Sequence, residues 1–413
     1  MTMQPVAALA AHLDAFTRAR ADLLHWFTEQ AMPLWSTAGT DWVQGGFAEK
    51  LNDQGQPVDE PRRTRVVARQ LYVFSVARKL GWQGDASRWV GHGLDFLLNR
   101  LKQADGTFAS SVTPAGQVVN ARFDLYEQAF ALFAMATAYR LNPQASQGLR
   151  VASERLLEAL RARWAHPEMG FEESIPPSVP LRSNPHMHLF EAALQWAEAL
   201  PHPDQRWGAL ADELAALSLR HLIDAPSGLV TELFDAHWGP MPGTDGTLAE
   251  PGHQFEWGWL LCRWARQDPS QHPETEAALA AAQRMVHLAE AHGIDRQRGV
   301  AINEINTDLS VREAHAKLWP QTERIKAWVA LAQLAHDRGE VTALAQALQA
   351  ATAAMGGLRA YLHHPVAGAW QEVWRADGSW QAEPVRASSL YHIVCALETL
   401  HDAGDFGLEA AST

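Results

Sequence analysis

Apolar residues recur with a helical period through most of this chain. They fall at positions i, i+3, i+4 and i+7, the spacing of a helix that buries one face. Prolines and glycines interrupt the pattern between one segment and the next. The periodicity predicts twelve helical segments, at residues 5–32, 62–80, 86–102, 122–140, 146–163, 184–200, 205–222, 250–267, 273–292, 312–336, 341–362 and 386–402.

A short glycine-containing motif follows each odd-numbered segment. In this motif a glycine is followed closely by an aromatic or aliphatic residue and often by a glutamate, as in Gly46-Phe47-Ala48-Glu49. The first glycines are Gly46, Gly106, Gly170, Gly228, Gly299 and Gly368, with separations of 60, 64, 58, 71 and 69 residues. This spacing indicates a sixfold internal repeat of helix, small hairpin and helix.

Each repeat unit is too small to bury both faces of its helices, so the units must pack on their neighbours. Six helical hairpins can close into a double ring, and the alternative is an open superhelix of helix pairs. The even-numbered segments are more apolar on all sides, as the inner ring of a closed barrel should be. We therefore expect an all-α fold, an (α/α)6 barrel with short β-hairpins in its loops, and a single domain over residues 1–413.

Composition and charge exclude several classes of protein. Of the 413 residues 47% are apolar, which is enough for a large core and argues against global disorder. Lys and Arg number 34 against 47 Asp and Glu, for a formal net charge of −13. Nucleic acids and anionic membranes both bind clustered positive charge, so neither is an expected partner.

The chain also lacks signals for export or membrane insertion. No apolar run approaches the roughly 20 residues that span a bilayer, and residues 1–12 lack the basic region and apolar stretch of a signal peptide. Cys262 and Cys395 are the only cysteines, and both lie in apolar helical patterns. A disulfide framework or a thiolate zinc cluster is therefore not expected, and a cytoplasmic location fits.

Polar residues capable of chemistry cluster near the starts of the even-numbered segments. They lie in six segments: Arg69 to Tyr72, Asp124 to Gln128, Asn184 to Glu191, Glu250 to Trp257, Lys317 to Glu323 and Ser388 to His392. Inner helices of a closed barrel run parallel, so their starts should meet at one end and form a pocket. The positive ends of the helix dipoles would favour negative charge developing there.

The spacing of these residues supports a shared site. Asn184 and His188 are four residues apart, and His253 precedes Glu256 by three, so each pair shares a helix face. His186 and His188 point to different faces, so one of the two should be structural. Histidines outnumber carboxylates among the converging residues, which favours proton transfer near neutral pH.

Two other chemistries stay open at this point. His188, His253, Glu256 and His392 could bind a metal, although no dense HExxH motif occurs. Paired carboxylates could hydrolyse glycosides, as in other helical double barrels. GxGxxG, P-loop and GxSxG motifs are absent, so dinucleotide binding, phosphate-loop chemistry and serine hydrolysis have no support.

The polar motifs resemble those of the N-acylglucosamine 2-epimerase superfamily of (α/α)6 barrels. The resemblance extends over about residues 20 to 400, and each motif falls on its own repeat in the family's order. The matching segments are Ala68 to Ser75, Asp124 to Phe130, Asn184 to Glu191, Glu250 to Trp259, Lys317 to Glu323 and Ser388 to His392.

The resemblance implies isomerisation or epimerisation of a monosaccharide through an enediol, with no cofactor and no metal. It implies two catalytic histidines, His253 and His392. The other family positions, which contact substrate, are Arg69, Tyr126, Asn184, His188, Glu256, Trp319 and Glu323. The motifs around His253 and His392 look most like the aldose–ketose isomerase branch. Cellobiose 2-epimerases carry a Trp shortly before the last His, where this chain has Arg386-Ala387.

We therefore expect an aldose–ketose isomerase for mannose-like sugars, with a 2-epimerase or a non-catalytic sugar-binding barrel as alternatives. His392 is expected to move a proton from C2 to C1 of the sugar. His253, with its ring oriented by Glu256, should assist ring opening and serve the other face, and Arg69 should stabilise the enediolate. The sequence leaves the formation of a homo-oligomer open.

Overall fold

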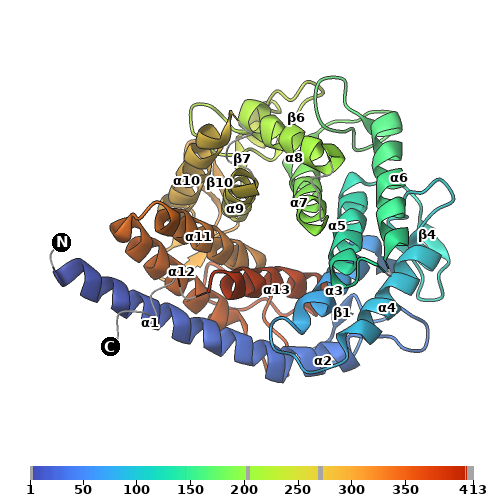
Figure 1. Ribbon diagram of the computed structural model, residues 1–413, viewed down its shortest axis with the longest axis horizontal. Coiled ribbons are helices and arrows are strands. Elements are labelled where there is room, and N and C mark those ends of the chain that lie inside the picture. Colours follow the sequence, from blue (N-terminus) through green and yellow to red (C-terminus); the bar gives the residue numbers. More distant parts are fainter. Residues whose placement is uncertain (1–2, 145, 201–204, 268–272, 405, 407–413) are drawn as a thin grey trace.

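Helices form two concentric layers in the computed structural model, which describes residues 3–144, 146–200, 205–267, 273–404 and 406 (Figure 1). The inner ring consists of α3 (Thr64–Ala77), α5 (Leu125–Leu141), α7 (Ser183–Ala199), α9 (Pro251–Gln267), α11 (Trp319–Asp337) and α13 (Ala387–Asp402). The outer layer consists of α1 (Met3–Trp26), α4 (Ala86–Phe96), α6 (Gln147–Trp164), α8 (Gln205–Leu217), α10 (Thr275–His292) and α12 (Val341–Tyr361). Outer and inner helices alternate along the chain, as predicted.

The inner ring is closed. Each inner helix packs on the next, from α3 through α5, α7, α9 and α11 to α13, and α13 packs back on α3. The fold is therefore an (α/α)6 barrel and not an open superhelix. Burial explains the choice of layers: every residue from Glu127 to Tyr139 of inner helix α5 is buried, whereas outer helix α6 buries only one face.

Helix boundaries differ most from the prediction in two places. After α1 the chain continues through a π-helical turn (Phe27–Ala31) into α2 (Met32–Thr37), five residues beyond the expected end. The segment predicted at 312–336 is the larger error, because α11 begins only at Trp319. The preceding residues form β11 (Val311–Glu313) and β12 (Ala316–Lys317), and strands this short carry no period that separates them from a helix.

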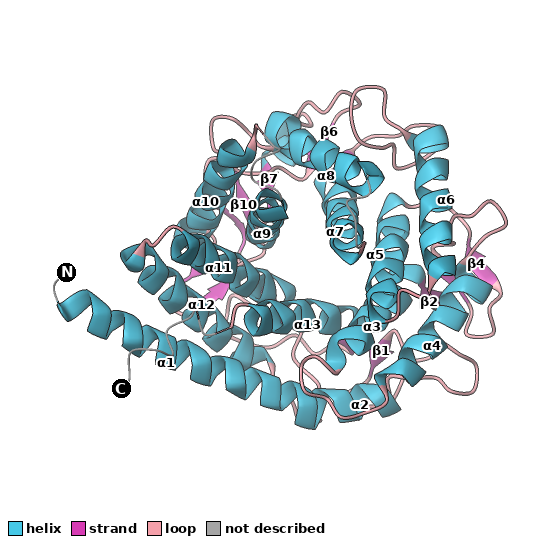
Figure 2. Cartoon of the chain, in the orientation of Figure 1, coloured by secondary structure: helices cyan, strands magenta, loops and turns pink. Residues whose placement is uncertain are grey.

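Short antiparallel strands join neighbouring repeats (Figure 2). The pairs between repeats are β1 (Lys50–Leu51) with β14 (Val385–Arg386), β2 (Arg62–Arg63) with β3 (Ser111–Val112), β5 (Leu181–Arg182) with β6 (Leu233–Phe234), β7 (Leu248–Ala249) with β10 (Glu304–Asn306), and β12 with β13 (Val373–Trp374). The strands within one repeat are β4 (Val118–Asn120), which pairs with β3, β11, which pairs with β10, and the pair β8 (Ile294–Asp295) and β9 (Val300–Ala301). Since β2, β5, β7, β12 and β14 lead almost directly into inner helices, these pairings fix where the inner helices begin.

A recurring side chain in the first turn of the inner helices holds the hairpin of the same repeat. Gln254 accepts a hydrogen bond from the N–H of Val230 (2.8 Å), donates to the carbonyl of the same residue (2.8 Å) and approaches the carbonyl of Glu250 (3.3 Å). Gln128 and Gln321 make the same set of contacts in α5 and α11. His186 occupies this position in α7, where its ring contacts Phe171 and Arg182.

Glutamates of the glycine-containing motif form a second recurring contact. Each accepts a hydrogen bond from the backbone N–H of a residue that directly precedes an inner helix. The pairs are Glu49 with Arg63 (2.7 Å), Glu173 with Arg182 (2.6 Å), Glu232 with Glu250 (3.2 Å) and Glu372 with Arg386 (2.8 Å). These bonds place buried carboxylates at the end of the barrel where the inner helices start.

Most buried apolar side chains belong to one continuous core between and within the two helix layers. A smaller cluster of Leu229, Ala249, Ile302 and Ile305 lies among the hairpins. None of the described helices is both long enough and apolar enough to span a membrane.

Candidate active site

Side chains from equivalent positions of the six inner helices form layers across the barrel. The starting residues, one just before each inner helix, are Arg63, Asp124, Arg182, Glu250, Lys317 and Arg386. The residues two positions later form the mouth layer: Arg65, Tyr126, Asn184, Gly252, Trp319 and Ser388. Those six positions later form the middle layer (Arg69, Phe130, His188, Glu256, Glu323 and His392), and those nine positions later form the floor layer (Tyr72, Phe133, Glu191, Trp259, Lys326 and Cys395). Steps of three and four residues return to the same helix face, so all three layers point inward.

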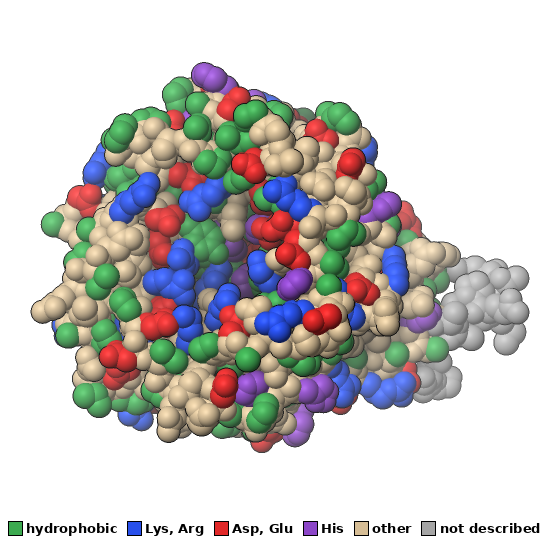
Figure 3. Space-filling view, turned by 180° about the vertical axis from the view of Figure 1, so that it is seen from behind, with side chains coloured by type: hydrophobic (Ala, Val, Ile, Leu, Met, Phe, Trp, Pro, Cys, Tyr) green, Lys and Arg blue, Asp and Glu red, His purple; other side chains and the backbone are tan. Residues whose placement is uncertain are grey.

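The mouth and middle layers enclose a cavity of about 250 Å³. Eight of the nine sequence-predicted site residues line it: Arg69, Tyr126, Asn184, His188, His253, Glu256, Trp319 and His392. Glu323, the ninth, is fully buried behind His392. Figure 3 shows a hollow at the centre of the face opposite that of Figure 1, with side chains of both charges around it.

His392 is held as a neutral ring. Its Nδ1 lies 2.9 Å from Oε1 of Glu323, which marks Nδ1 as the protonated nitrogen and leaves the lone pair on Nε2. Burial lowers the pKa of His392 well below its ordinary value, and the nearby charges of Arg69 and Lys326 lower it further. A buried imidazole of this kind can accept a proton at neutral pH.

His253 has the opposite charge state. Its Nδ1 lies 2.9 Å from Oε2 of Glu232. Burial disfavours the charged ring, but the carboxylates of Glu232 and Glu250 outweigh burial and raise the pKa of His253 to about 10. His253 is therefore an imidazolium at neutral pH and can donate a proton.

The partner of His253 corrects the sequence analysis, which assigned Glu256 to orient this ring. The carboxylate of Glu256 makes no hydrogen bond to any described residue, and it lies 3.8 Å from Lys326 Nζ and 4.0 Å from His188 Nδ1. Glu232 reaches His253 from the glycine-containing motif of its own repeat, 21 residues earlier. The glutamate that recurs in this motif was the sequence signal that could have identified Glu232 as the partner of His253.

Trp319 connects the two histidines. Its ring centroid lies 4.9 Å from that of His253 and 5.8 Å from that of His392, with an interplanar angle of 39° in each case. A proton donor and a proton acceptor therefore flank one aromatic side chain at the cavity wall. An apolar face of this kind can pack against the carbon skeleton of a sugar.

Arg69 brings a fixed positive charge into the middle layer. Its guanidinium lies 4.3 Å from the ring centroid of Phe130, and Nη2 donates to the hydroxyl of Tyr126 (2.8 Å). Arg69 has no carboxylate within ion-pair distance among the described residues, although it is only 6% exposed. Its charge is available to stabilise an oxyanion in the cavity.

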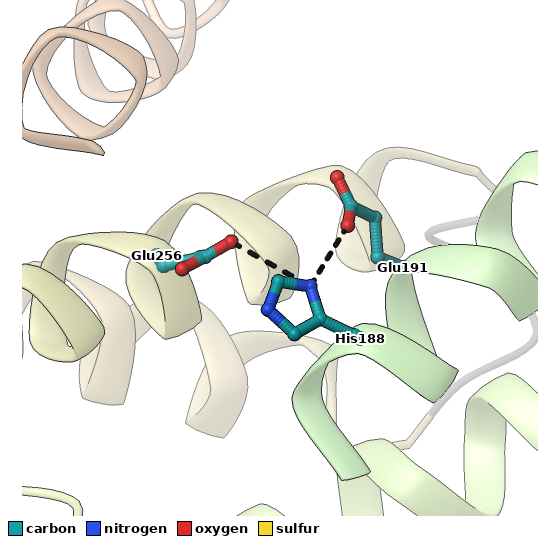
Figure 4. Close-up of side chains that lie close together, drawn as sticks. All are labelled: His188, Glu191 and Glu256. Atoms are coloured by element: carbon teal, nitrogen blue, oxygen red, sulfur yellow. Dashed lines mark hydrogen bonds and ion pairs between the residues drawn. The ribbon is translucent and has the colours of Figure 1, made fainter. Parts of the chain in front are cut away.

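A buried group of three side chains is formed by His188 and Glu191 of α7 and Glu256 of α9 (Figure 4). His188 Nδ1 lies 3.2 Å from Oε2 of Glu191, which also accepts a hydrogen bond from the hydroxyl of Tyr391 (2.5 Å). Burial lowers the pKa of His188 to about 4, so this ring is neutral and presents its other nitrogen for a hydrogen bond. Burial and the charge of Glu323 raise the pKa of Glu256 to about 8.

Lys326 was not predicted from the sequence, yet it lies directly beneath the site. It is fully buried, forms an ion pair with Glu323 and places Nζ 3.9 Å from the ring centroid of Trp259. The positive charge of Lys326 therefore compensates the negative charge of Glu323, the carboxylate that contacts His392. The only sequence signal was a lysine three residues after Glu323, within a run of apolar residues.

His186, by contrast, does not reach the cavity. Its contacts to the backbone of Phe171 and Arg182 make it the structural member of the His186/His188 pair, as expected for one of the two. Cys262 and Cys395 are buried free thiols.

Histidine and carboxylate groups near the cavity could also be considered as metal ligands. Among the described residues three sets lie close enough together: His188, Glu191 and Glu256; Glu232, Glu250 and His253; and Glu256, Glu323 and His392. In each set the histidine Nδ1 already faces a carboxylate oxygen. In the third set the ammonium of Lys326 supplies the positive charge that a metal would bring. These contacts fit a proton-transfer network better than a set of open metal ligands.

The sequence matches a known family over most of its length. The family described as N-acylglucosamine 2-epimerase (GlcNAc 2-epimerase) matches residues 45–396. A protein named mannose-6-phosphate isomerase from Rhizobium meliloti (strain 1021) is 40% identical over 391 residues, which cover 95% of this chain and 97% of the relative. A protein named D-mannose isomerase from Thermobifida fusca is 27% identical over 343 residues, covering 77% and 81%.

Solved structures share the fold at lower sequence identity. Cellobiose 2-epimerase from Bacillus thermoamylovorans B4167 superimposes with a TM-score of 0.79 at 16% identity, covering 93% of this chain and 99% of that one. A D-mannose isomerase superimposes with a TM-score of 0.77 at 19% identity, covering 95% and 97%. The chain belongs to the N-acylglucosamine 2-epimerase family and is an enzyme of the sugar isomerase or epimerase type.

Proposed function

We propose that this enzyme is an aldose–ketose isomerase that interconverts a mannose-like aldose and its ketose without a metal or nicotinamide. The observation that carries the proposal is the pair of histidines in opposite charge states on either side of Trp319. An isomerase needs one group that accepts a carbon-bound proton and one that protonates the carbonyl oxygen. The two relatives named as mannose isomerases support the same reaction, although one name specifies a phosphorylated sugar.

The neutral His392 acts as the base in the proposed mechanism. Its Nε2 takes the proton from C2 of the open-chain aldose, and the electrons of that C–H bond form the C1–C2 double bond of an enediol. His253 donates a proton to the carbonyl oxygen O1 as negative charge develops there, and Arg69 stabilises that charge. His392 then returns its proton to C1, while the O2 proton passes back to His253 and leaves the ketose.

A sugar 2-epimerase is the second candidate, favoured by the family's description and by the protonated state of His253. In epimerisation C2 is reprotonated from the opposite face of the enediol, and a second histidine that already holds a proton could do this. The two reactions share the first step and differ in which carbon receives the proton.

Mannose incubated with the enzyme in D₂O separates the two reactions. We expect fructose as the early product by NMR, with deuterium at C1 to the extent that His392 exchanges its proton with solvent, and with activity unchanged by EDTA. Substitution His392→Ala should lower turnover at least about 10²-fold, the contribution of one general acid or base. The exposed His292, at the end of outer helix α10, provides the matched control His292→Ala.

Three results would contradict this assignment. Glucose that appears before fructose, deuterated at C2, would replace the isomerase by an epimerase. Wild-type turnover by His392→Ala would remove His392 as the base. Loss of activity in EDTA, restored by a divalent ion, would return metal chemistry to the site.

A further inference from the structure

A second cavity of about 240 Å³ adjoins the active-site cavity at the mouth of the barrel. The two share four lining residues: Arg69, Tyr126, Asn184 and Ser388. The side chains that line only the second cavity are Arg63, Arg65 and Arg182. The mechanism above gives these three arginines no role.

Buried carboxylates hold each of the three guanidinium groups along one edge. Arg63 Nε donates to Glu49 (2.7 Å), Arg65 Nη1 lies 3.1 Å from an oxygen of Glu127, and Arg182 Nε donates to Glu173 (2.5 Å). The same carboxylates accept backbone N–H groups of Arg63, Arg65 and Arg182, so their positions are fixed.

Each guanidinium keeps N–H groups that are not used by the described residues. Nη1 of Arg63, Nη1 of Arg182, and Nε and Nη2 of Arg65 make no hydrogen bond there. An arginine has five N–H donors, so a paired arginine can still bind an anion through its free edge.

The charge of Arg65 is the least cancelled of the three. Burial raises the pKa of its partner Glu127 to about 7, against the opposing effect of Arg65 itself. At neutral pH a fraction of Glu127 therefore carries a proton and leaves the charge of Arg65 uncompensated.

The arginine-lined cavity lies at the starts of α3, α5 and α7, on the side of the ring opposite α11. His253, Trp319 and His392 belong to α9, α11 and α13, whereas Arg63 directly precedes α3, Arg65 lies in its first turn and Arg182 directly precedes α7 (Figure 1). A sugar whose C1–C2 end lies between the histidines would direct its other end toward these arginines, past Arg69 and Tyr126, which line both cavities.

We propose that Arg63, Arg65 and Arg182 form a subsite for a phosphate group on the far end of the sugar, so that the substrate class is the hexose 6-phosphates. This rests on the proposed function, since it places the reacting end of the substrate at His253 and His392. A phosphate presents several acceptor oxygens, and fixed guanidinium edges recognise such an anion through charge-assisted hydrogen bonds. A phosphorylated substrate would use the unoccupied donors that a neutral hexose leaves unpaired.

The test compares mannose 6-phosphate with mannose on the full-length enzyme. We expect kcat/KM to be at least about tenfold higher for the phosphorylated sugar, as one charge-assisted hydrogen bond would give. Inorganic phosphate should inhibit competitively. Arg65→Gln, and Arg182→Lys, which keeps the charge beside Glu173 but loses the planar fork, should each lower the ratio of the two kcat/KM values by about tenfold. Arg220→Gln is the matched control, because Arg220 is exposed on the outer layer and pairs with Glu274.

The proposed phosphate subsite and the proposed isomerase activity can be disproved independently of each other. Turnover of mannose that equals or exceeds turnover of its 6-phosphate, or a preference for a disaccharide, would overturn the subsite and leave the isomerase standing. An unchanged ratio in both arginine variants would do the same. If neither sugar is converted, the proposed function fails, and calorimetry then decides the subsite. Mannose 6-phosphate binding that Arg65→Gln weakens would support the subsite, and absent or unaltered binding would overturn it.

Discussion

Two histidines of one cavity hold different charges because the groups behind them differ. His253 faces Glu232, with Glu250 close by, and no cation of the described residues pairs with Glu232. His392 faces Glu323, whose charge is compensated by the buried ammonium of Lys326. Both residues are histidines, so the residue type does not decide which one donates and which one accepts a proton. The charges of the neighbouring groups decide it.

The pH dependence of kcat/KM should report both groups. Activity should fall at low pH only where His392 becomes protonated, well below its ordinary pKa, and at high pH as His253 loses its proton near 10. Substitution Lys326→Met removes a cation that lowers the pKa of His392, so the acidic limb should move to higher pH. Lys326→Arg should restore the original limb.

Lys79→Met is the control for the lysine, because Lys79 pairs with Glu398 and Asp402 and lines neither cavity at the mouth of the barrel. Thermal unfolding of each variant would separate loss of fold from a changed titration. An acidic limb that stays in place in Lys326→Met would show that the charge of Lys326 does not reach His392.

The sequence predicted the nine site residues through the family resemblance, whose motifs lie near the starts of the even-numbered helical segments. Glu232 and Lys326 were missed for two physical reasons. Glu232 reaches its histidine through the fold of the hairpin, and a lone lysine in a buried helix gains its meaning only from the carboxylates packed around it. Pairing of this kind between distant residues leaves no local signal.

At the scale of the elements, the inner helices α5, α7, α9 and α11 begin where a glutamine or histidine closes a hairpin. The side chains of Gln128, Gln254, Gln321 and His186 contact the same three kinds of backbone group in their own repeats. A buried backbone group that loses its partner costs about 1–3 kcal/mol. These contacts should therefore contribute measurably to folding.

Swapping the residue types tests this role. His186→Gln should preserve the contacts and change the free energy of unfolding by less than about 1 kcal/mol, whereas Gln254→Leu should lower it by about 2–5 kcal/mol because two backbone groups of Val230 lose their partner. Denaturant titration measures both. A larger loss in His186→Gln than in Gln254→Leu would mean that His186 does something that glutamine cannot.

Helices were predicted more accurately than strands for a related reason. The apolar period of a helix is local and extends over many turns, so the predicted inner and outer segments begin and end close to the observed helices. Strands such as β12 contain two residues, and their partners lie in a neighbouring repeat. The false helical start at 312 comes from reading β11 and β12 as part of α11.

For the whole molecule, the closed ring joins the first repeat to the last. Helix α3 packs on α13, and β1 pairs with β14 through Lys50 and Arg386. In an open superhelix the end repeats would lose contacts on one side and could unfold separately. In a closed ring with one continuous core every repeat has two neighbours.

We therefore expect the protein to unfold in one cooperative transition. Differential scanning calorimetry should give a single peak, with the calorimetric and van't Hoff enthalpies in agreement. Two resolved transitions would contradict the single domain predicted for residues 1–413. Because the ring has no free end, a mutation that weakens one repeat should shift the whole transition to lower temperature.

His186 and His188 illustrate what the layered barrel permits. The two residues are two positions apart, and the helix turns by about 200° between them, so one closes a hairpin and the other enters the cavity. Residues that hold the loops and residues that line the cavity therefore lie on separate faces of the same helical turn. Evolution can exchange one residue of the middle layer, where arginine, phenylalanine, histidine and glutamate already occupy equivalent positions, without disturbing the loops that shape the entrance. One barrel can thereby acquire new substrates by single exchanges at inherited positions.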